Sequence, residues 1–145
     1  MNAHSHPICK VASIAREYGE LTAIRHAADC AGNTTEMDRL DVLRADLEMR
    51  ASLLVPTSPT GAVFLLAIIS SCAGVLEGCE LREPYEARMH ELIRRCTYRV
   101  AEYHRNMGGQ LASIVWEYHM PDYLDPANAS MPVTPADTPA SLGTH

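Results

Sequence analysis

The pattern of hydrophobic and polar positions is dominated by the stretch from Ser58 to Cys79, which is apolar on every side of a helix over several turns. No charged residue lies between Arg50 and Glu77. A helix without a polar face has to be enclosed by other helices or by lipid. We therefore predict a helix that has Ser58 as its cap, with Pro59 behind it, and we expect the flanking segments to surround it.

The segment before this stretch divides into two amphipathic helices. The first runs from about Pro7 to Ala31, with apolar residues at helical spacing, and Gly32 followed by Asn33 supplies a left-handed stop. Its stripe consists of Ile8, Val11, Ile14, Tyr18, Leu21, Ile24 and Ala28. The second carries the stripe Met37, Leu40, Leu43, Leu47, Ala51 and Leu54.

The limits of the second helix follow from its flanking residues. Two alternative capping boxes could begin it, Asn33 with Glu36 or Thr35 with Asp38. We expect it to end near Val55, because Pro56 disfavours helical geometry in the residue before it. Its opposite face is charged, and the spacings predict ion pairs between Asp41 and Arg44 and between Asp46 and Arg50.

A fourth helix is expected from Pro84 onward. Its stripe stays in phase across Gly108 and Gly109, which predicts one long helix to about Tyr118, bent at the glycines. The stripe consists of Tyr85, Met89, Leu92, Cys96, Val100, Tyr103, Met107, Leu111, Ile114 and Tyr118.

These elements predict an all-α protein, an antiparallel four-helix bundle with the apolar third helix innermost. Residues 1–120 form a single domain in this interpretation. Residues 121–145 are rich in Pro, Ser and Thr without apolar periodicity, which predicts a disordered tail. The far end of the fourth helix would overhang a compact bundle and needs a covering surface, which favours a homodimer. The residues expected at that interface are Leu111, Ile114, Val115, Trp116 and Tyr118.

Composition supports one helical domain. The chain has 145 residues, of which 47% are hydrophobic, but it has one Phe and one Trp, so an aliphatic core is expected. The net charge of −6 argues against a broad phosphate-binding surface. The first residues lack a basic region followed by an apolar run, so no export signal is expected and a cytoplasmic location follows. The five cysteines form no CxxC pair and are expected to be buried thiols.

No motif indicates catalysis, a metal or a cofactor. Histidines and cysteines occur near one another at His4, His6 and Cys9, and at His26 and Cys30, but neither group completes a ligand set. His90 and Glu91 begin like a helical zinc-protease signature, yet Arg94 stands where the second histidine is required. The nucleophile elbow and the phosphate loop are absent from the sequence. We therefore expect a non-enzymatic protein.

Two features of the sequence bear on nucleic-acid or anion binding. Ile14, Ala15 and Gly19 resemble the first half of a helix-turn-helix, but Glu20 and Arg25 do not fit the second half, which favours one uninterrupted helix. The arginines of the fourth helix are interleaved with glutamates, which favours a solvated face that neutralises itself. These residues are Arg88, Arg94, Arg95, Arg99 and Arg105, with Glu86, Glu91 and Glu102.

One resemblance concerns the turn Val55-Pro56-Thr57-Ser58-Pro59-Thr60-Gly61, with the helix before it and the apolar helix after it. This layout, over about forty residues, resembles small uncharacterised helical proteins of bacteria. The resemblance implies no activity, cofactor or site residue.

The sequence therefore favours a helical protein-interaction module, most simply one that associates with itself. Two alternatives remain open. The chain could be anchored in a membrane by residues 61–76, or it could be a small helix-turn-helix regulator that binds DNA.

Overall fold

The computed structural model describes residues 8–78 and 80–108. This part of the chain contains four helices and no strand, which confirms the all-α class. The helices are α1 (Lys10–Cys30), α2 (Thr34–Ser52), α3 (Pro59–Gly78) and α4 (Tyr85–Gly108).

The turn between α1 and α2 forms as the sequence predicts. Gly32 has a φ of 66°, the left-handed conformation that closes a helix and that glycine adopts without strain. The side chain of Asn33 then accepts a hydrogen bond of 3.1 Å from the N–H of Glu36, so the first of the two capping boxes is the one that forms.

The end of α2 differs from the prediction. The helix stops at Ser52, three residues before Val55, because its last turn tightens. The N–H of Leu53 bonds to the carbonyl of Arg50 at 3.3 Å, and that of Leu54 to Ala51 at 3.0 Å. The cap of α3 is confirmed, since the Ser58 hydroxyl accepts from the N–H of Gly61 at 3.2 Å.

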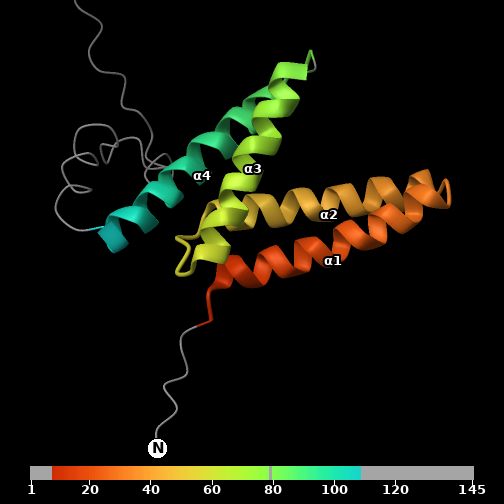
Figure 1. Cartoon of the computed structure of the whole chain (residues 1–145). Coiled ribbons are helices and arrows are strands. Elements are labelled where there is room, and N and C mark those ends of the chain that lie inside the picture. The colour runs from red at the N-terminus through yellow and green to blue at the C-terminus, as the bar shows by residue number, and fades with distance from the viewer. Residues whose placement is uncertain (1–7, 79, 109–145) are drawn as a thin grey trace, which may run out of the picture.

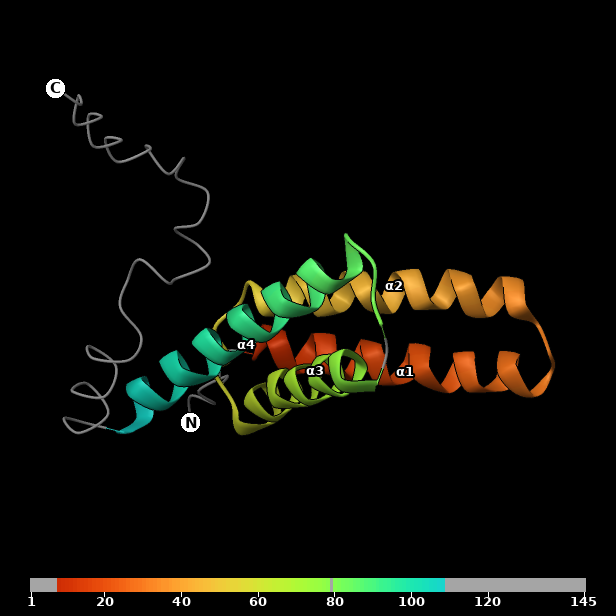
Figure 2. The same ribbon diagram turned by 90° about the horizontal axis from the view of Figure 1, so that it is seen from above.

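The helices form two hairpins that cross each other. In Figure 1, α1 and α2 lie side by side as one hairpin, and α3 and α4 form a second that runs steeply across it. Figure 2 shows that α3 and α4 cover only the half of the first hairpin that holds the start of α1 and the end of α2. The tip of the first hairpin projects beyond this crossing.

The hydrophobic core lies at the crossing. It is built from aliphatic side chains and thiols, as the scarcity of aromatic residues predicts. Leu65, Leu92 and Cys96 have no exposed surface. The buried cluster consists of Cys9, Val11, Ile14, Leu47, Ala51, Leu65, Ile68, Cys72, Leu92, Cys96 and Val100.

The expected enclosure of the apolar third helix is wrong for the described residues. α3 packs mainly on α4 and in part on α1, while α2 touches it little. Its outer side is open, with Val63 63% exposed and Leu66 47% exposed. The physical reason is the crossing. The α1–α2 hairpin runs across α3, so it covers α3 at one place and not along its length.

Three expectations concern α1 and the ends of the chain. α1 is continuous through Gly19, which confirms the uninterrupted helix and excludes the helix-turn-helix alternative at this place. The continuation of α4 to Tyr118 and the tail at 121–145 lie outside the described residues. The same holds for His4 and His6.

The first turn of α3 supplies a test of the crossing. A Cβ added at Gly61 would lie 2.9 Å from Sγ of Cys9 and 3.1 Å from Cβ of both Pro56 and Val11. We expect Gly61→Ala to lower the free energy of unfolding by about 1–3 kcal/mol, because those neighbours are themselves packed. Urea denaturation measures this change.

The matched control is Gly19→Ala. Gly19 lies within α1 and has nothing within 4 Å of the added Cβ, so alanine should raise the free energy of unfolding by about 0.5–1 kcal/mol. Equal effects of the two substitutions would contradict the close contact at Gly61.

Candidate functional site

The open face of α3 is the most unusual surface of the described residues. We define it by Val63, Leu66, Ala67, Ser70 and Gly74, which recur at helical spacing and are all exposed. Val75, 38% exposed, lies at its edge. No charged side chain interrupts this face from Pro59 to Leu76. An exposed apolar strip of this length is characteristic of a surface that another molecule covers.

The space beside the glycines on this side of α3 is empty of other described residues. A Cβ added at Gly74 or Gly78 would have nothing within 4 Å among the described residues. Ser70, Gly74 and Gly78 repeat every four positions, and this spacing predicts a groove in which the backbone of a neighbouring segment can approach closely. Within the described part of the chain nothing fills that groove.

The opposite side of α3 faces the core. Its residues are buried at the same helical interval, shifted around the axis: Gly61, Ala62, Leu65, Ile68 and Cys72. α3 is therefore two-sided in the structure although both sides are apolar in the sequence. The two sides differ little in polarity, since Ser70 is the one hydroxyl among the residues that define the open face.

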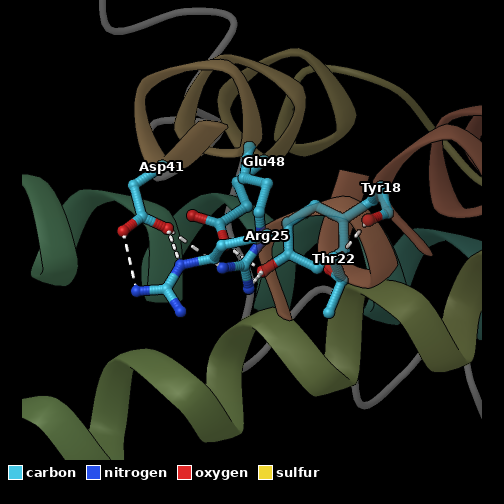
Figure 3. Close-up of polar contacts among 6 residues, drawn as sticks. Tyr18, Thr22, Arg25, Asp41 and Glu48 are labelled. Carbon is cyan, nitrogen blue, oxygen red and sulfur yellow. Dashed lines mark hydrogen bonds and ion pairs between the residues drawn. The ribbon is translucent and has the colours of Figure 1, made fainter. Parts of the chain in front are cut away.

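A polar network joins α1 to α2 (Figure 3). The Tyr18 hydroxyl donates to Oε1 of Glu48 at 2.9 Å and accepts from Nη2 of Arg44 at 2.7 Å. Asp41 accepts from Nε of Arg25 at 2.6 Å and from Nη1 of Arg44 at 3.1 Å. The network therefore connects two carboxylates, two guanidinium groups and one phenol across the hairpin.

The network also reaches α3. The ring of Tyr18 meets that of Phe64 edge to face, with ring centres 5.3 Å apart, and the Arg44 guanidinium lies 4.7 Å over the Tyr18 ring. Burial and the charge of Glu48 raise the pKa of Tyr18, so the phenol stays protonated and donates. Hydrogen bonding to Arg25 holds the pKa of Asp41 low. The arrangement stabilises the hairpin, because its acids and bases are engaged with each other.

Cys9 lies where α1 begins, beside the loop that leads into α3. It is 8% exposed, and its Sγ accepts a hydrogen bond of 3.3 Å from the N–H of Thr57. Burial raises the pKa of this thiol, but hydrogen bonds from Ser58 and Thr57 outweigh burial and lower the pKa to about 6. The start of a helix also favours the thiolate.

The core thiols have the opposite character. Burial raises the pKa of Cys96 to about 12, and burial likewise raises the pKa of Cys72. These thiols are inert packing groups. The expectation that all five cysteines are buried is wrong at Cys30, which is exposed, and Cys79 lies outside the described residues.

The candidate metal ligands do not assemble. Sγ of Cys30 lies 3.8 Å from Nε2 of His26, but no third ligand joins them. Among residues 8–78 and 80–108, no group of three or more His, Cys, Asp and Glu side chains could hold an ion.

Arg94, Arg95 and Arg99 of α4 pair with glutamates of their own helix, as predicted, whereas Arg88 donates to the carbonyl of Ala45 in α2. Arg94 bonds to Glu91 at 2.7 Å, and Arg99 bonds to Glu102 at 2.9 Å. The expectation of a solvated face is wrong at Arg99, which is only 6% exposed. Its guanidinium lies 5.8 Å over the ring of Tyr98, and long cationic side chains commonly bury their stems in this way.

An open groove of about 560 Å³ lies between α2 and the first turns of α4. Its charged lining groups already have partners: Arg88 donates to the carbonyl of Ala45 at 2.8 Å, and Asp46 lies 3.8 Å from Arg50. Asp41 belongs to the network above. The lining residues are Asp41, Val42, Ala45, Asp46, Met49, Tyr85 and Arg88.

The residues that the sequence assigns to an interface, Leu111, Ile114, Val115, Trp116 and Tyr118, lie outside the described residues. The sequence missed Val63 and Leu66 as surface residues, because uniform hydrophobicity predicts enclosure. Comparison with known protein families, curated proteins and solved structures finds no match. Function is therefore argued from the geometry of this chain.

Cys9 gives a testable chemical prediction. We expect its alkylation by iodoacetamide to rise with pH around a midpoint near 6, because hydrogen bonds hold its pKa at about 6. Thr57→Val removes one of the donors from an exposed position and should move the midpoint upward. Mass spectrometry of the labelled peptides measures both rates, with the high-pKa thiol of Cys96 as the unreactive internal control.

The same pKa has a consequence for stability. In the unfolded chain the thiol has its ordinary pKa of 9.0, so the folded chain binds the proton more weakly. The contribution of Cys9 to stability is complete above pH 9, decreases as pH falls and is lost below pH 6. A midpoint of alkylation above pH 8 would contradict both statements.

The network predicts a cost for loss of the Tyr18 hydroxyl. Tyr18→Phe should lower the free energy of unfolding by about 0.5–1.5 kcal/mol, because Glu48 and Arg44 each lose a partner while the ring contact with Phe64 remains. Tyr85→Phe is the matched control, since Tyr85 is 63% exposed. Chemical denaturation measures the free energy of unfolding of both variants. Equal values for Tyr18→Phe and Tyr85→Phe would contradict a stabilising role of the network.

Proposed function

We propose that this protein is a non-enzymatic helical interaction module that associates with a second copy of itself through the open face of α3. The observation that supports the proposal is the exposure of a helix that carries no charged side chain from Pro59 to Leu76. Of the most apolar 18-residue window of α3, only 28% is buried inside the protomer.

The energetic argument concerns Val63 and Leu66. Full burial of a Val or Leu side chain is favourable by about 1.5–3 kcal/mol relative to exposure. With exposed fractions of 63% and 47%, each retains a substantial part of that free energy for a partner to release. The flanking small residues, Ser70 and Gly74, add close contact without the entropy cost of ordering long side chains.

A second copy suits this face because the face has no charge to match. In a two-fold dimer both copies bring the same surfaces to the interface, so a charged group on this face would need an opposite charge supplied by the same chain. The open face of α3 carries no charge and needs none. A charged ligand would find no complementary group there.

Membrane association is the rival interpretation, because α3 is long and apolar enough to cross a bilayer. α3 shares its buried side with α4, however, and α4 carries Arg94, Arg95 and Arg99 on the same helix as core residues such as Leu92. Insertion of α3 into a bilayer would separate it from α4 and expose the core residues of α4. Protein association leaves the core intact, which favours it.

The test is the double substitution Val63→Asp with Leu66→Asp. We expect the purified wild-type chain to have the mass of a dimer in light scattering and the variant that of a monomer, with unchanged helical circular dichroism. The reason is that a dimer would bury two carboxylates without partners.

The matched control is Ile24→Asp with Val42→Asp, which adds the same charges at positions of α1 and α2 that are 51% and 70% exposed. This control should keep the mass of the wild type. A variant mass equal to that of the wild type would overturn the proposal. Co-sedimentation of the wild type with phosphatidylcholine vesicles, lost in the α3 variant, would instead establish the membrane interpretation.

A further inference from the structure

The end of α4 determines where the following chain begins. α4 has 24 residues and α3 has 20, so α4 is longer by about 6 Å at the rise of an α-helix. Figures 1 and 2 both show the end of α4 beyond the start of α3, on the side away from the tip of the α1–α2 hairpin. Met107, in the last turn of α4, is 72% exposed. The last turn of α4, which leads into residue 109, therefore lies outside the core of the protomer.

The first part of that chain carries an apolar pattern of its own. Leu111, Ile114, Val115 and Tyr118 recur at helical spacing, and Glu117 is the one Asp, Glu, Lys or Arg among residues 109–120. As a helix these twelve residues would extend about 18 Å, close to the roughly 17 Å that the helical rise gives between Val63 and Gly74 of the open face. The segment matches the open face of α3 in length, and its apolar stripe carries no charge.

The area of a dimer requires more than α3 alone. Even a strip along the whole of α3, about 30 Å long and 10 Å wide, offers only on the order of 300 Å² per copy, whereas a stable interface buries about 800 Å² per partner. A second apolar element has to contribute. Residues 109–120 are an apolar segment of the same chain, and they follow α4 directly.

We propose that residues 109–120 of each copy pack on the open face of α3 of the other copy, in a reciprocal exchange. This inference rests on the proposed function and names the part of the partner that is bound. The exchange is closed and two-fold, because each copy gives one segment and receives one. Exchange between copies is favoured over packing within one copy, since α4 ends beyond α3 and a return to its own open face needs a reversal directly after Gly108.

The experiment combines two variants of the full chain. The face variant is Val63→Asp with Leu66→Asp, and the segment variant is Leu111→Asp with Ile114→Asp. We expect each variant alone to be monomeric in light scattering. An equimolar mixture should form a heterodimer, because the intact segment of the face variant meets the intact face of the segment variant.

The one tryptophan of the chain, Trp116, provides a second readout. Its emission should move to shorter wavelength when the two variants are mixed. The matched control for the segment is Gln110→Asp with Ser113→Asp, which adds the same charges off the apolar stripe and should remain dimeric. Circular dichroism verifies that every variant keeps the helices of the described residues.

The outcomes separate the two proposals. A monomeric face variant with a dimeric segment variant would leave the proposed function standing and overturn the exchange. Two monomeric variants that do not combine on mixing would also overturn the exchange. A dimeric face variant would overturn the proposed function and the exchange together.

Discussion

The crossing of the two hairpins depends on a close contact at the first turn of α3. Gly61 has no side chain, and Cys9, Val11 and Pro56 occupy the space that a Cβ would need. The start of α1 and the loop after α2 can therefore lie directly against the α3 backbone. These three segments meet where the second hairpin runs across the first. The aliphatic core forms at that point, and its buried thiols serve as packing groups.

This crossing gives the two halves of the molecule different surfaces. The α1–α2 hairpin is stabilised by groups that satisfy one another, such as Tyr18 with Glu48 and Asp41 with Arg25. Among the described residues, α4 likewise neutralises Glu91 and Glu102 with its own arginines. α3 has no such groups on its open face, so its exposed surface is unfavourable in water. Among the described residues, the open face of α3 is thus the apolar surface that the rest of the fold leaves uncovered.

The local structure of the chain was predictable from its residues. The left-handed turn at Gly32, the cap at Asn33 and the cap at Ser58 depend on backbone geometry within a few residues, so each forms as the sequence indicates. Amphipathic spacing also identified α1, α2 and α4, because such helices have one face that must be buried. The predicted end of α2 near Val55 lies three residues beyond the observed end at Ser52, because the effect of a proline on the residue before it does not indicate where the last turn tightens.

The sequence by itself determined the all-α class, the positions of the helices and the aliphatic nature of the core, because these follow from periodicity and composition. Tertiary structure alone decided which side of α3 is covered. Leu65 and Leu66 are adjacent and chemically identical, yet the first has no exposed surface and the second is 47% exposed. A helix that is apolar all round has no polarity by which its two sides differ, so only the direction in which the neighbouring hairpin crosses it separates core from surface.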